Sequence, residues 1–164
     1  MKRVVVGLFL LGLALGPSSA CGPSVDLAKD LEVTDVLTGY YDAGLKDGWN
    51  YLLPSISFRL HNKGAVKIGP VQVTAAFWKK GEDGDWQSVV LQGIHAGGLA
   101  PGASTESLTA RSDVGYRIEG PRADLFTHSQ FKDVTAKMFA SQGGAIVALG
   151  NHDLEHTIIP HIGK

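Results

Sequence analysis

The chain has 164 residues, with 15 basic and 16 acidic side chains, so its net charge is close to zero. A near-neutral chain has no electrostatic footprint for nucleic acid and no polybasic segment for anionic lipid, and both partner classes are excluded on that ground. The single cysteine rules out a disulfide within the chain, so stability must come from a hydrophobic core.

The first twenty residues have the three-part pattern of a secretory signal. Met1–Arg3 is basic, residues 4–15 are apolar apart from two glycines, and residues 16–20 are mostly small. The apolar part has about twelve residues, which is short of the ~20 that a membrane-spanning helix needs. We expect residues 1–20 to be removed as a signal peptide and residues 21–30 to form a tether.

Cys21 directly follows the small residues at the end of this signal. The tetrapeptide Ser18-Ser19-Ala20-Cys21 resembles the lipobox of bacterial lipoproteins, although Ser18 stands where the box usually has Leu. Plain cleavage by the ordinary signal peptidase is the alternative. The resemblance implies lipidation of Cys21, and Gly22 in place of Asp implies the outer membrane. The expected location is its periplasmic side or the cell surface.

The rest of the chain consists of short apolar segments separated by turn signals. None of them has the apolar stripe of an amphipathic helix. Strands are predicted at residues 31–38, 53–62, 71–78, 86–91, 104–110, 131–139, 146–149 and 154–159. Seven or eight such strands predict an all-β fold, a single antiparallel β-sandwich over residues 31–160, with a closed barrel as the alternative and a tail at 161–164.

Two segments are predicted to be irregular. Gly39–Asn50 contains three glycines and three aromatic residues, and we expect a loop there. Arg111–Gln130 is the longest stretch without a strand pattern, and Leu125 and Phe126 are its expected inward-facing residues.

Three segments resemble the immunoglobulin-like or fibronectin-III-like domains of bacterial exported proteins. They are ISFRLHNKG (56–64), VQVTAAFWKKGEDGDW (71–86) and GGLAPGAST (97–105). The resemblance covers about residues 53–150 and implies a sandwich with a binding or scaffolding role. It carries no catalytic residues, and a fold by itself does not define a function.

Aromatic residues outside the predicted core are the candidate ligand-binding residues. Tyr40, Tyr41 and Trp49 fall in the predicted loop, and Trp78 falls on the polar face of its strand. Exposed aromatic rings stack on sugars or anchor partner proteins. The alternative is that the loop aromatics cover an open edge of the core and that Trp78 pairs with Trp86 across a hairpin.

Histidines near the end of the chain are candidate metal ligands. His152 and His156 match the H-x-x-E-H pattern of inverted zinc peptidases, and His161 follows. That pattern requires a helix, whereas residues four apart on a strand are ~13 Å apart. Residues 150–153 also match part of a metallophosphoesterase motif, but the other parts of that motif are missing.

Taken together, the sequence predicts an exported lipoprotein that is not an enzyme and has no cofactor. Its role would be binding, structural support or assembly at the cell envelope. One alternative is a carbohydrate- or peptide-binding module that uses the exposed aromatics. A small metal-dependent hydrolase that uses the histidines is the other.

Overall fold

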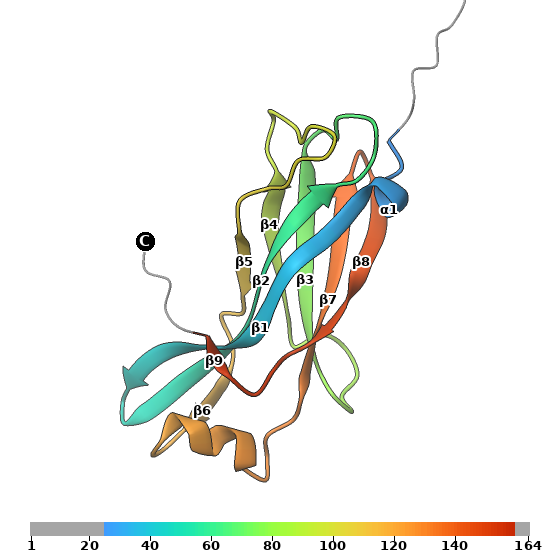
Figure 1. Cartoon of the computed structure of the whole chain (residues 1–164). Helices are drawn as coiled ribbons and strands as arrows, with labels where there is room; N and C mark the ends of the chain where they lie inside the picture. Colours follow the sequence, from blue (N-terminus) through green and yellow to red (C-terminus); the bar gives the residue numbers. More distant parts are fainter. Residues whose placement is uncertain (1–24, 160–164) are drawn as a thin grey trace, which may run out of the picture.

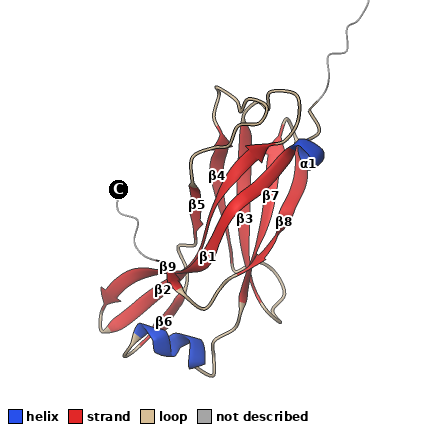
Figure 2. Cartoon of the chain, in the orientation of Figure 1, coloured by secondary structure: helices blue, strands red, loops and turns tan. Residues whose placement is uncertain are grey.

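The computed structural model describes residues 25–159, most of which lie in strands of two facing sheets (Figures 1 and 2). The first sheet has the strand order β5-β2-β1-β9, with β6 also paired to β2, and the second has the order β4-β3-β7-β8. The predicted all-β fold is confirmed. The elements are α1 (Leu27–Asp30), β1 (Leu31–Lys46), β2 (Trp49–Asn62), β3 (Val71–Lys79), β4 (Gln87–Ile94), β5 (Leu108–Arg111), β6 (Tyr116–Ile118), the 3₁₀ helix η1 (Arg122–Thr127), β7 (Val134–Gln142), β8 (Ala145–Asp153) and β9 (Ile158–Ile159).

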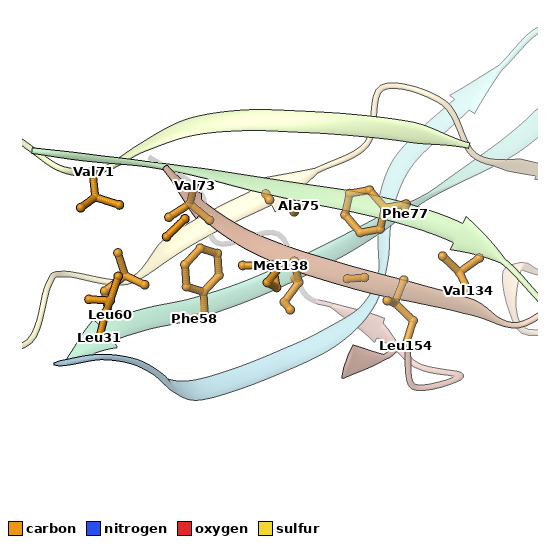
Figure 3. Close-up of a cluster of buried hydrophobic side chains, with 14 of the residues drawn as sticks. Leu31, Phe58, Leu60, Val71, Val73, Ala75, Phe77, Val134, Met138 and Leu154 are labelled. Carbon is orange, nitrogen blue, oxygen red and sulfur yellow. The ribbon is translucent and has the colours of Figure 1, made fainter. Parts of the chain in front are cut away.

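The hydrophobic core lies between the two sheets and follows the alternation of the strands (Figure 3). Phe58 and Leu60 on β2 and Val73 and Phe77 on β3 have no exposed surface. Each such side chain contributes roughly 1.5–3 kcal/mol to folding by leaving water. Successive side chains of a strand point to opposite faces, so the two-residue period of these segments already identifies their core faces.

The first two strands form one long hairpin, and the predicted loop at Gly39–Asn50 is wrong. The β1–β2 pairing continues to Lys46 opposite Trp49, so only Asp47 and Gly48 form the turn. Both have positive φ, 50° and 82°, as expected for a two-residue hairpin whose twist matches that of the strands. Beyond the sandwich this hairpin and β6 form an arm at the lower left of Figure 1.

The start of the described chain is more ordered than the predicted tether at residues 21–30. Asp26 caps α1 by accepting a hydrogen bond from the backbone N–H of Ala28, and Leu27 is buried against the core. The tether prediction can therefore apply only upstream of the described residues, where Cys21 also lies.

The end of the described chain returns to the first sheet. Only Ile158 and Ile159 pair there, and they run parallel to β1 at Tyr40 and Tyr41, whereas a fully antiparallel sandwich was predicted. The segment predicted to be irregular, 111–130, contains β6 and η1. The described residues thus hold nine strands, against seven or eight predicted. The additional strand is β6, which is only three residues long. Of the strand predicted at 154–159, only Ile158 and Ile159 form β9.

Candidate binding groove

A cluster of aromatic rings fills the end of the sandwich from which the arm extends. Tyr40 of β1 lies 5.4 Å from Phe126 of η1 and 5.7 Å from Phe131, measured between ring centroids. Tyr116 of β6 lies 5.0 Å from Phe131 and 4.9 Å from Trp86. Tilted and edge-on pairs at these distances are favourable contacts. The cluster therefore holds η1 and the following loop against the two sheets.

Tyr40 lies at the centre of this cluster and cannot be the exposed ligand-binding residue that was predicted. It has no exposed surface, because the predicted loop is strand and directs this side chain inward. Within residues 25–159 its hydroxyl has no hydrogen-bond partner. Burial raises the pKa of Tyr40 well above its ordinary value, with smaller contributions from Tyr116 and Asp133.

A groove of about 920 Å³ runs beside the cluster. One wall is formed by five consecutive residues, 115–119, which include β6, and the opposite wall is formed by η1 and residues 127–131. Trp49, Trp86, Tyr116 and Phe131 line it with half-buried rings. The groove therefore combines aromatic ring surface with a larger share of polar and charged side chains, among them Arg117, Glu119 and Gln130.

Lys79 connects this groove to the hairpin that follows β3. Its ammonium lies 4.0 Å from the ring centroid of Trp86 and 3.7 Å from the Glu82 carboxylate. Lys132 also contacts Glu82, at 2.8 Å. These two cations, with the Lys132 hydrogen bond contributing most, lower the pKa of the exposed Glu82.

A smaller cleft of about 560 Å³ lies on the other side of Lys79. Trp78 lines it and carries the ammonium of Lys137 at 3.6 Å from its ring centroid. Its remaining lining is of mixed charge, with Lys80 as well as Asp133 and Asp153. Such a cleft favours no single sign of ligand charge.

The structure separates the four aromatic residues that the sequence singled out. Trp49 lines the groove, Tyr41 faces outward beneath Arg111 at 4.0 Å, and Trp78 lies on the second sheet. Three groove residues were not predicted: Trp86, Tyr116 and Phe131. Trp86 was expected to pair with Trp78, but it packs on Tyr116 instead. No local sequence signal identifies these residues, because pairing of distant segments creates the groove.

The histidines do not converge. His152 is half-buried on β8 opposite Ala136, whereas His156 stacks on Phe126 with Nε2 2.8 Å from a carboxylate oxygen of Asp133. Among residues 25–159 there is no group of three or more His, Cys, Asp or Glu side chains that could hold a metal ion. His161 lies outside the described residues. Through these contacts His156 joins the loop between β8 and β9 to η1 and to the segment between η1 and β7.

Comparisons with known proteins identify no family. No protein-family model matches the chain, and no curated protein matches its sequence. Two solved structures are similar to part of the chain. A structural-genomics target called SoR45 has 14% sequence identity and a TM-score of 0.44, and the match covers 84% of this chain and 92% of that chain. A Bordetella pertussis protein provisionally assigned as ApaA has 19% sequence identity and a TM-score of 0.39, and the match covers 80% of this chain and 95% of that chain. In the described part of the chain no helix has the length and apolar character needed to cross a membrane.

Proposed function

We propose that this chain is an exported, lipid-anchored binding protein without enzymatic activity, built on an immunoglobulin-like sandwich. The chain crosses between the sheets after β2, β4, β6 and β8, and this alternation supports the immunoglobulin-like assignment. The lipid anchor rests on the sequence context of Cys21.

The observation that carries the binding role is the aromatic groove. Its four rings come from separate parts of the chain, and they remain partly exposed although three of them also belong to the cluster that encloses Tyr40. Ligand sites are usually concave, with polar groups that fix the orientation of the ligand, and this groove supplies such groups beside its ring faces. The ligand that suits this shape is a segment of a longer envelope polymer, held by ring contacts and by polar groups at the rim.

The position of the groove fits a protein that is anchored through its N-terminal end. The described chain begins beside α1, and β1 runs from there to the arm at the opposite end (Figure 1). Its 16 residues span up to roughly 50 Å at about 3.3 Å per residue. Val25 is four positions after Cys21, which corresponds to at most ~14 Å of extended chain. An anchored molecule would therefore present its groove away from the membrane that holds it.

The test is site-specific photo-crosslinking in the native host with the full-length protein. A photoreactive residue at Ser129, on the rim of the groove, should give one defined adduct, and the same residue at exposed Glu106 should not. A second substitution that narrows the groove, Gln130→Trp, should remove the adduct. The captured ligand should have the same mass as the free ligand if the protein does no chemistry on it. Equal labelling from both positions would contradict the proposal.

A further inference from the structure

The outer face of the first sheet carries a row of regularly spaced arginines. Arg59 lies on β2, Arg111 is paired with Ser55 of β2, and Arg117 is paired with Tyr51 of β2. Successive members are thus four β2 positions apart, which corresponds to about 13 Å along the sheet.

Two of these arginines are held in place by aromatic rings and not by acids. The guanidinium of Arg111 lies 4.0 Å from the ring centroid of Tyr41, and that of Arg117 lies 4.8 Å from that of Trp49. Both side chains are exposed, and neither forms an ion pair with any of residues 25–159. A guanidinium that lies on a ring keeps its N–H groups available for a carboxylate.

The acids close to the row do not neutralise these two positions. Asp35 lies 3.5 Å from Arg59 and pairs with that member alone. Glu119 follows Arg117 by two residues and is exposed, but it makes no ion pair with it. Asp113, which follows Arg111 by two residues, is also exposed; its carboxylate accepts a hydrogen bond from Gln87 at 3.4 Å and forms no ion pair with Arg111. Arg111 and Arg117 are therefore the two members of the row that no described acid pairs with.

An apolar position lies between these two arginines on the neighbouring strands. Leu53 and its β1 partner Tyr41 lie midway between the two positions, and both are half-buried. Measured along β2, this face therefore presents Arg111 of β5, Leu53 of β2 and Arg117 of β6 at two-residue intervals. In an extended peptide, residues two and four apart also lie on one face, at about 7 and 13 Å.

We propose that this face binds an extended peptide segment that carries an acidic residue, an apolar residue two positions later and a second acidic residue two positions after that. The two carboxylates would accept hydrogen bonds from Arg111 and Arg117, and the apolar side chain would lie over Leu53. This surface is adjacent to the groove and shares Arg117 and Trp49 with it, but the proposal does not depend on the groove.

The test uses full-length protein without its signal peptide and a labelled seven-residue peptide, with Glu second and sixth, Val fourth and Thr elsewhere. A peptide with adjacent glutamates, a peptide with glutamines in their place, and oligogalacturonate serve as competing probes. The spaced peptide should bind best, and higher salt should weaken its binding. Removing one exposed ion pair should weaken binding about fivefold, and Arg111→Gln with Arg117→Gln by tenfold or more.

The matched control is Lys63→Gln with Lys67→Gln, which removes two exposed cations from the loop between β2 and β3. This double variant should leave peptide binding unchanged. Gln130→Trp, which narrows the groove, should also leave peptide binding unchanged, so failure of the groove proposal can be distinguished from failure of this one. Equal loss in the control, equal binding of the peptide with adjacent glutamates, or preference for oligogalacturonate would overturn the proposal. Loss of binding by the glutamine peptide tests the same point on unaltered protein, should the arginine variants not fold.

Discussion

Gly39 of β1 lies so close to Thr157 that a Cβ atom at position 39 would be 2.7 Å from the Thr157 carbonyl oxygen. The same atom would be 2.9 Å from Cγ1 of Ile159, and the φ of Gly39 is +156°. The backbone N–H of the next residue, Tyr40, donates to this Thr157 carbonyl at 2.9 Å. The end of the described chain can therefore pair with β1 only because position 39 has no side chain.

Replacing Gly39 by Ala should destabilise the protein by about 3 kcal/mol, because the new methyl group meets a backbone oxygen and the φ value is unfavourable for alanine. Urea unfolding followed by tryptophan fluorescence measures the change. Gly97→Ala is the control: nothing lies within 4 Å of a Cβ there. Its expected effect is within about 0.5 kcal/mol. A Gly39 variant as stable as the control would show that β9 does not pack on β1.

The side chain of Asn62, which has no exposed surface, joins three segments at the opposite end of the sandwich. Its amide donates to the carbonyl oxygens of Val66 and Leu99, both at 2.9 Å, and its oxygen accepts from the N–H of Gly64 at 3.0 Å. Asn62→Ala leaves these buried groups without a partner and should cost about 3 kcal/mol in unfolding free energy. Replacement of the exposed Asn151 should have little effect, and a similar loss at both positions would contradict this account.

The two tyrosines of the aromatic cluster should respond in opposite ways to removal of the hydroxyl. Tyr40→Phe removes a buried hydroxyl without a partner in the described structure and should stabilise the fold by about 1 kcal/mol. Tyr116→Phe removes a hydroxyl that donates to the Lys132 carbonyl oxygen at 2.9 Å and should destabilise it by a similar amount. Thermal unfolding at neutral pH compares the two, and a shift of the same sign in both would contradict the assignment.

Alkaline pH should unfold the protein through the same two residues. Burial raises the pKa of both Tyr40 and Tyr116 above the ordinary value of 10.0, so above that pH the unfolded chain loses protons that the folded chain retains. Stability should therefore be unaffected below pH 10 and should fall as the pH rises beyond it. Tyr40→Phe should reduce this alkaline loss, which denaturant unfolding between pH 8 and pH 11 measures. An unchanged pH profile would show that Tyr40 is not buried.

The sequence predicts the parts of this fold that depend on local pattern. The alternation in β2 and β3 identifies their core faces, because each strand is long and has one buried face. The Asp47–Gly48 turn was missed because Gly39 and Gly44 precede it, and a segment rich in glycine resembles a loop. Both glycines are nevertheless part of β1. Gly39 leaves room for the backbone of Thr157, and Gly44 lies at a register shift in the strand.

The candidate site was much harder to predict than the strands. Trp49 was singled out for its place in a supposed loop, yet it lines the groove from a strand. Tyr116 and Phe131 come from a stretch without periodicity, and they become part of a site only through contact with Trp86 and Tyr40. The cations that cover Tyr41, Trp49 and Trp78 are likewise separated from these rings in sequence. Such contacts follow from sheet pairing, which local composition does not encode.

Replacing Cys21 by Ser should release the protein from the membrane fraction of a bacterial host, if the anchor proposed for this residue is correct. Two or more acyl chains hold a protein firmly at a membrane, at ~0.8 kcal/mol for each buried methylene group, so their loss should remove this retention. Fractionation measures the release, and mass spectrometry of the mature protein measures the lipid directly. Ser18→Leu, which brings the segment closer to the lipobox pattern, should preserve or increase lipidation. A mature protein with a free thiol at Cys21 would refute the anchor.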